Sequence, residues 1–187
     1  MNFITKNLKQ AGIFNATLII ATLILQVYQI CVITGTYGFN AMHFINNISI
    51  IIALISGLFY AFYGYKKTAA KYYKAFMVLT LIAFVCTLIP YLQKSYLMVV
   101  ACLAFARIIP LVLLTFKKDF GKKNSVICAY ITFALTLATM IIGPFFYVSA
   151  QTSSYGIALS LNNILLAAII IIFVEAKYAD KEARGTK

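Results

Sequence analysis

Arg107 is the residue whose type and position most clearly suggest chemistry, because it is the only charged residue in an apolar run at about 96–116. It falls near the middle of that run, which in a helix is about 15 Å from either end. An ionised guanidinium at the centre of a bilayer costs about 2.5 to 3.5 kcal/mol on insertion scales, and such residues usually face a bundle interior or a wet cavity and have a partner. We therefore expect Arg107 to face other helices and not lipid.

The partner of Arg107 is left open by the sequence. No acidic residue falls at its depth, since all four lie at or beyond the ends of the apolar runs: Asp119, Glu175, Asp180 and Glu182. Pro110 cannot donate to the carbonyl of Ala106, so we expect a kink that frees an acceptor beside Arg107. That carbonyl or an amide side chain of another helix would make Arg107 a structural cross-link, whereas a bound carboxylate or phosphate would make it a ligand-binding residue.

Amide and hydroxyl side chains recur at helical spacing in four other apolar runs. They are Asn15, Thr22, Gln26 and Gln29; Asn46, Asn47, Ser49 and Ser56; Ser125, Thr132, Thr136 and Thr139; and Ser160, Asn162 and Asn163. Residues three or four apart share one face of a helix, and a polar face is expected to point away from lipid.

A ligand site would therefore combine Arg107 with polar residues of the bundle interior. The candidates are Gln26, Gln29, Asn46, Asn47, Thr136, Asn162 and Asn163. The alternative is helix packing, because small and hydroxyl residues commonly hold membrane helices together and a threonine can bond to its own preceding turn.

Metal and catalytic chemistry have little support in the sequence. The four cysteines form no C-x-x-C pair, and His43 is the only histidine, so zinc sites and paired-histidine haem sites lack their ligands. The chain also has no nucleotide-binding motif and no nucleophile with a plausible base and orienting carboxylate. We expect no catalytic residue, no metal, no cofactor and no enzymatic activity.

Six apolar runs are long enough to cross a bilayer and must position these residues. They lie at about 11–34, 44–65, 73–92, 96–116, 125–148 and 156–175. Hydrophobic residues make up 63% of the chain and charged residues 11%, compared with about 25% charged residues in soluble domains. The sequence therefore predicts an all-α integral membrane protein, a single domain over 1–187 that consists of a bundle of six transmembrane helices joined by short loops.

Lysine and arginine are concentrated on one predicted side of the membrane. That side carries Lys6, Lys9, Lys66, Lys67, Lys71, Lys74, Lys117, Lys118, Lys122, Lys123, Lys177, Lys181, Arg184 and Lys187. Only Lys94 falls on the other side, so the positive-inside rule places both termini in the cytoplasm, with the chain in the cell membrane. The net charge of +12 then reflects topology and does not indicate nucleic-acid binding.

The basic loops at 66–74 and 117–123 lie beside predicted helix ends. They are expected to attract anionic lipid headgroups, and the alternative is a docking surface for a soluble protein.

Two kinds of internal repeat are compatible with the order of the runs. A break followed by an aromatic residue recurs at 35–37, 89–91 and 143–145, which would fit three helical hairpins. Two oppositely oriented three-helix halves, common in transporters, fit equally well. The sequence leaves two functions open. One is a small transporter, or transporter subunit, for a neutral or anionic solute. The other is a sensor, scaffold or regulatory subunit that acts through a partner protein.

The topology can be tested by labelling in intact cells. A cysteine placed beside Lys94 should react with an impermeant thiol reagent added outside, whereas one beside Lys71 should not, because the two positions are predicted to lie on opposite sides of the membrane. The unsubstituted chain, with its four native cysteines, gives the background. The reverse pattern would contradict the predicted orientation.

Overall fold

The computed structural model describes residues 8–37, 41–92, 98–117, 120–146 and 154–185, and within these ranges it contains helices and turns but no strand. The helices are α2 (Leu8–Tyr37), α3 (Ala41–Phe62), a short 3-10 helix η1 (Lys67–Ala69), α4 (Ala70–Leu92), α5 (Met98–Phe116), α6 (Lys122–Phe146) and α7 (Ser154–Gly185). Each of the six α-helices contains a segment long and apolar enough to cross a membrane. This confirms the predicted all-α class with six membrane-spanning helices. Lys94, the single basic residue predicted on the other side, lies outside the described residues.

The distribution of side chains is the reverse of that in a water-soluble protein. Large apolar side chains face outward along the helices, among them Ile13, Phe14 and Phe62. Polar side chains such as Thr22 and Gln26 are fully buried. An apolar outer surface of this extent is stable in contact with lipid and would be an aggregation hazard in water.

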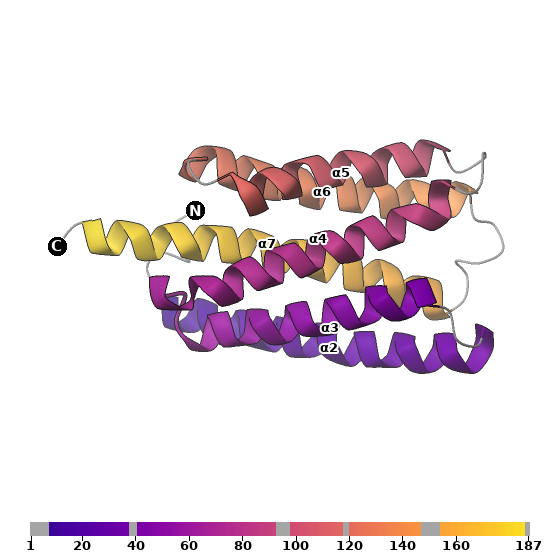
Figure 1. Cartoon of the computed structure of the whole chain (residues 1–187), viewed down its shortest axis with the longest axis horizontal. Helices are drawn as coiled ribbons and strands as arrows, with labels where there is room; N and C mark the ends of the chain where they lie inside the picture. The colour runs from indigo at the N-terminus through magenta and orange to yellow at the C-terminus, as the bar shows by residue number, and fades with distance from the viewer. Residues whose placement is uncertain (1–7, 38–40, 93–97, 118–119, 147–153, 186–187) are drawn as a thin grey trace.

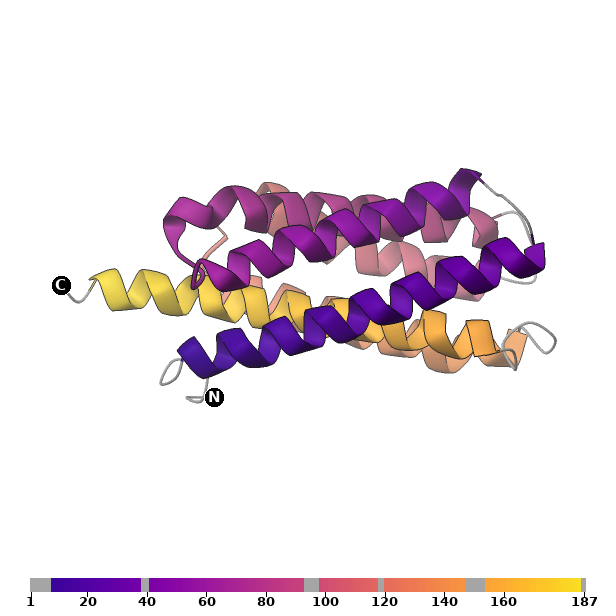
Figure 2. The same cartoon turned by 90° about the horizontal axis from the view of Figure 1, so that it is seen from below.

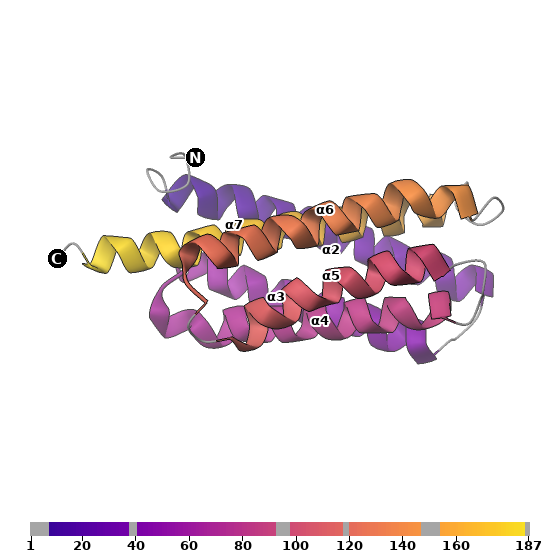
Figure 3. The ribbon, with the colours of Figure 1, turned by 90° about the horizontal axis from the view of Figure 1, so that it is seen from above.

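The helices form two rows of three, as the two side views show (Figure 1, Figure 3). One row is α2, α7 and α6, and the other is α3, α4 and α5. Figure 2 shows α2 lying alongside α7. The central pair, α4 and α7, touch each other between the rows, so each is flanked by helices on both sides.

This arrangement maps onto itself when helices α2 to α4 are exchanged with α5 to α7. The contact of α2 with α7 becomes that of α5 with α4, the contact of α3 with α4 becomes that of α6 with α7, and the α4–α7 contact is retained. The same contacts also fit three helical hairpins, α2–α3, α4–α5 and α6–α7, because each hairpin then packs against the next around the bundle. The contacts between helices thus fit both kinds of repeat, and we call α2 to α4 and α5 to α7 the two halves of the bundle.

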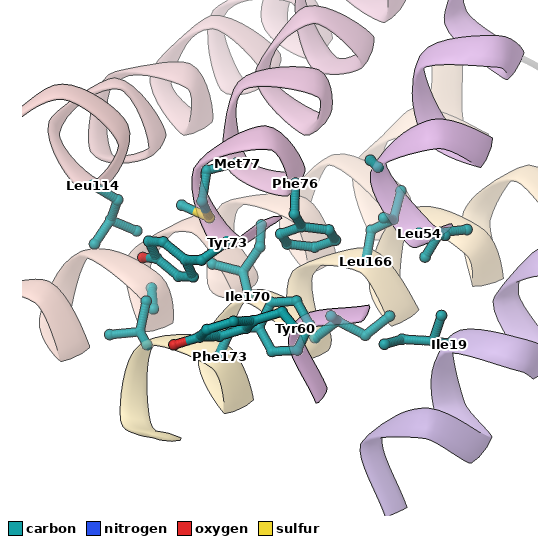
Figure 4. Close-up of a cluster of buried hydrophobic side chains, with 14 of the residues drawn as sticks. Ile19, Leu54, Tyr60, Tyr73, Phe76, Met77, Leu114, Leu166, Ile170 and Phe173 are labelled. Carbon is teal, nitrogen blue, oxygen red and sulfur yellow. The ribbon is translucent and has the colours of Figure 1, made fainter. Parts of the chain in front are cut away.

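An aromatic cluster fills the bundle toward the end that carries Lys66, Lys67 and Lys71, which we call the lysine-rich end. It consists of Tyr60, Tyr65, Tyr73, Phe76 and Phe173, all of them buried. Figure 4 shows four of these rings converging from α3, α4 and α7. The Phe173 ring lies 4.8 Å from that of Phe76 and 5.2 Å from that of Tyr60, measured between centroids. These are the separations at which edge-to-face aromatic pairs attract.

The chain leaves α3 earlier than the apolar run predicts, at Phe62, because the turn that follows has a left-handed backbone. Gly64 and Tyr65 have φ angles of 61° and 60°. The Tyr65 amide donates to the Tyr60 carbonyl at 3.1 Å and the Gly64 amide to that of Ala61 at 2.9 Å, which is the Schellman pattern of helix termination.

A left-handed conformation is unfavourable for tyrosine, at a cost of about 1 to 2 kcal/mol, so packing must hold Tyr65 in place. Its ring packs against that of Tyr60 at 5.3 Å, and its hydroxyl accepts a hydrogen bond from Asn15 Nδ2 at 3.4 Å. Burial raises the pKa of the Tyr65 phenol more than the Asn15 hydrogen bond lowers it. The neutral phenol therefore closes this end of the bundle.

Gly57 tests how tightly the aromatic cluster is packed. A Cβ atom at Gly57 would lie 3.1 Å from the Phe173 ring and 3.2 Å from that of Phe76. Gly57→Val should therefore lower stability by about 1 to 3 kcal/mol through overpacking, seen as a lower unfolding temperature in detergent. Gly12→Ala is the matched control, since its Cβ would meet no described atom closer than 3.9 Å. Equal unfolding temperatures for the two variants would contradict the tight packing.

Candidate functional site

Three buried amide side chains form a hydrogen-bonded chain across three helices. Asn162 Nδ2 on α7 donates to Gln26 Oε1 on α2. Gln26 Nε2 in turn donates to Asn47 Oδ1 on α3 at 2.5 Å. All three lie in the part of the bundle remote from the lysine-rich end, since Asn47 and Asn162 come soon after the starts of α3 and α7. Gln26 holds its position because both ends of its amide are bonded.

Further buried amide atoms around this chain have no hydrogen-bond partner among the described residues. They are Nε2 of Gln29, Oδ1 of Asn46 and Oδ1 of Asn162. Gln29 lies one helical turn from Gln26, and Asn46 directly precedes Asn47. A buried polar group left unsatisfied costs about 1 to 3 kcal/mol. The amide cluster, defined as Gln26, Gln29, Asn46, Asn47 and Asn162, therefore has hydrogen-bonding capacity that the described protein atoms do not use.

Arg107 lies at the centre of α5, nine residues from Met98 and nine from Phe116. Its side chain is only 1% exposed. Its Cζ atom lies 4.2 Å from the centroid of the Phe84 ring, and its Nη2 donates to Thr87 Oγ1 at 2.7 Å. Both contacts are with α4. The structure thus gives Arg107 a cation–π contact and a charge-assisted hydrogen bond between neighbouring helices.

Neither Phe84 nor Thr87 was identified from the sequence as a partner of Arg107. Thr87 Oγ1 also donates to the Phe84 carbonyl at 2.8 Å, so its oxygen is oriented to accept from Arg107. Spacing along the chain gave no signal for this pair, because Thr87 lies five residues from the end of α4 whereas Arg107 lies nine from the start of α5. The helix α5 continues through Pro110, which is buried.

The threonine face of α6 bonds to its own backbone. Thr132, Thr136 and Thr139 each donate to the carbonyl four residues earlier, at 2.9, 2.8 and 2.7 Å. The Thr136 hydroxyl therefore uses its single proton within α6, as the packing alternative expects. Its oxygen keeps the capacity to accept. Asn163, beside Asn162, is buried on α7.

The structure therefore brings together only some of the predicted site residues. Gln26, Asn47 and Asn162 are brought into contact, with Gln29 and Asn46 within one turn of them. Arg107 is bonded to α4 and Thr136 to its own helix. Their roles in ligand binding stay predictions.

The two polar links between helices occupy corresponding positions in the two halves of the bundle. Gln26 on the first helix of one half bonds to Asn162 on the third helix of the other. Arg107 on the first helix of the second half bonds to Thr87 on the third helix of the first. Both bonds therefore cross the interface between the halves.

No acidic side chain is fully buried in the part of the chain that the structure describes. Among the described residues no group of three His, Cys, Asp or Glu side chains is placed to hold a metal ion. Glu175 accepts a hydrogen bond from the Tyr130 hydroxyl at 3.2 Å, at an exposed position between α6 and α7.

Comparison with protein-family models, with curated proteins and with solved structures gave no match. The function is therefore argued from the residues themselves.

The Arg107–Thr87 bond can be tested as a structural link. Thr87→Val removes the acceptor of a buried guanidinium N–H and should lower stability by about 1 to 3 kcal/mol, because the charged donor loses a bond in a dry interior. Thermal unfolding of the purified protein measures the change. Thr115→Val is the matched control, since that hydroxyl bonds only to the Leu111 carbonyl of its own helix. If both variants unfold at the wild-type temperature, the Thr87 bond contributes nothing to stability.

Proposed function

We propose that the protein binds a small polar solute inside the membrane, as a transporter or as the membrane subunit of one. The observation that carries the proposal is the amide cluster. It is buried, it joins three helices, and three of its polar atoms have no partner among the described residues. A cluster needed only for packing would gain stability from satisfying those atoms within the protein.

The polar link between the first three and the last three helices favours transport over binding alone. In many transporters the solute site lies at the interface between inverted halves, and access alternates as one half moves against the other. Here the Gln26–Asn162 bond crosses between helices of the two halves. The aromatic cluster separates this region from the lysine-rich end.

The membrane and the orientation of the chain in it are part of this proposed function. The protein lies in the cell membrane with the lysine-rich end in the cytoplasm, where its lysines contact anionic headgroups. Lys71 and Lys177 lie over the rings of Tyr72 and Tyr73, at 5.0 and 4.7 Å from the ring centroids. The chain has no nucleotide-binding motif, so energy would come from an ion gradient or from a partner subunit. It would act without catalysis and without a cofactor.

A second candidate function is that of a sensor or regulatory subunit which acts through a partner protein. The observation in its favour is α7, whose last residues, up to Gly185, extend past the ends of the other helices at the lysine-rich end (Figure 1). A helix that projects from the membrane region offers a surface to a soluble protein. In this alternative the amide cluster only joins helices.

A thermal-stability screen against small polar metabolites tests solute binding. A solute at 100 times its Kd should stabilise the purified protein by about 2.7 kcal/mol. The stabilisation should be lost in Asn162→Leu, which breaks the amide chain, and kept in Thr139→Val, a buried hydroxyl that bonds to its own helix. If no solute stabilises the wild type while a soluble protein is retained by the lysine-rich end, the second candidate is correct.

A further inference from the structure

We propose that the amide cluster recognises an uncharged planar group that presents an N–H donor beside a carbonyl acceptor, as in a carboxamide, a lactam or a ureide. This inference rests on the proposed function and narrows its solute from any polar molecule to one chemical class.

The unpartnered atoms define what a ligand must provide. Gln29 Nε2 is a donor and needs an acceptor, whereas Asn46 Oδ1 and Asn162 Oδ1 are acceptors and need donors. All three side chains are more than nine-tenths buried. A group with N–H and C=O on adjacent atoms supplies both kinds of partner. Asparagine and glutamine recognise an adjacent donor and acceptor in the same way when they bind the amino group and ring nitrogen of adenine through two hydrogen bonds at once.

The amide cluster carries no positive charge that would attract an anion. The five side chains are neutral amides, and two of the three unpartnered atoms are carbonyl oxygens, which would repel a carboxylate or a phosphate. Arg107, the natural partner of an anion, belongs to α5, which packs against α4 and α6, whereas the cluster belongs to α2, α3 and α7. Its guanidinium lies over the ring of Phe84.

A cation is disfavoured by the same atoms. The amide cluster contains no carboxylate, and it includes the Gln29 Nε2 donor, which would face the cation with its protons. The remaining competitor is water, which can donate to the two carbonyl oxygens and accept from Gln29. Water and a planar amide can be told apart by titration, because only an added amide raises the unfolding temperature to a plateau as its concentration increases.

The experiment uses the full chain, purified in detergent, and pairs of probes that differ only in charge. Nicotinamide and benzamide are compared with nicotinate and benzoate, and uracil, 2-pyrrolidone and hydantoin extend the neutral set. Binding is measured by thermal shift and isothermal calorimetry. We expect at least one neutral probe to bind and to raise the unfolding temperature, with each carboxylate at least tenfold weaker than its amide.

Variants connect this binding to the cluster. Gln29→Met and Asn46→Leu keep the approximate shape of the side chain and remove its hydrogen-bonding atoms, so each should weaken binding of the neutral probe at least tenfold. Thr80→Val is the control, because the Thr80 hydroxyl is also buried and unpartnered among the described residues but lies on α4, outside the cluster. It should change the affinity less than twofold. Circular dichroism and the unfolding temperature without probe show whether each variant folds.

Three results would overturn the inference. If the carboxylates bind more tightly than the amides and Arg107→Gln abolishes that binding, the solute is an anion and only the proposed solute-binding function survives. If a neutral probe binds equally well to wild type, Gln29→Met and Asn46→Leu, the site lies elsewhere. If no probe binds, the cluster holds water, and the proposed function fails unless the metabolite screen finds another solute.

Discussion

The hydrocarbon core of a membrane supplies no hydrogen-bonding partner, and the rest of this structure depends on that constraint. Backbone groups must be satisfied within each segment, so the six apolar runs are helices. Polar side chains must find partners inside the bundle, so they lie on the faces where helices meet. Arg107 bonds to Thr87, Gln26 bonds to two amides, and the threonines of α6 bond to their own turns. The apolar outer surface and the polar faces inside the bundle therefore have the same cause, the hydrocarbon around the helices.

The interior is divided along its length into an apolar part and a polar part. Aromatic rings fill it toward the lysine-rich end, where Phe173 packs over Gly57 so closely that an added methyl group would make the neighbouring rings shift. The amides lie toward the other end, where hydrogen bonds replace ring contacts. Aromatic packing holds one arrangement, because a displaced ring loses its neighbours. Amide contacts can be exchanged for those of a ligand at little cost, which makes the polar part the better place for binding.

The candidate site could be predicted only in part from the sequence. Helical spacing correctly identified the buried faces that carry Gln26, Asn47 and Asn162, because a polar face must avoid lipid whatever it packs against. Spacing could not predict that these residues bond to one another, since the three helices are distant in the chain. Arg107 was expected inside the bundle and lies there, but its partners Phe84 and Thr87 were missed. A single hydroxyl and a phenyl ring carry no special signal in an apolar run.

The sequence by itself determined the class of protein, the six helices and a buried polar face on five of them, because these follow from local composition and from the 3.6-residue period of the helix. The early end of α3 was already encoded in Gly64, although the apolar run continues beyond it. Only the tertiary structure decided which helices are neighbours, that α4 and α7 form the centre, and which polar atoms are bonded or left over. Those outcomes depend on the packing of all six helices together, for which no single segment carries the information.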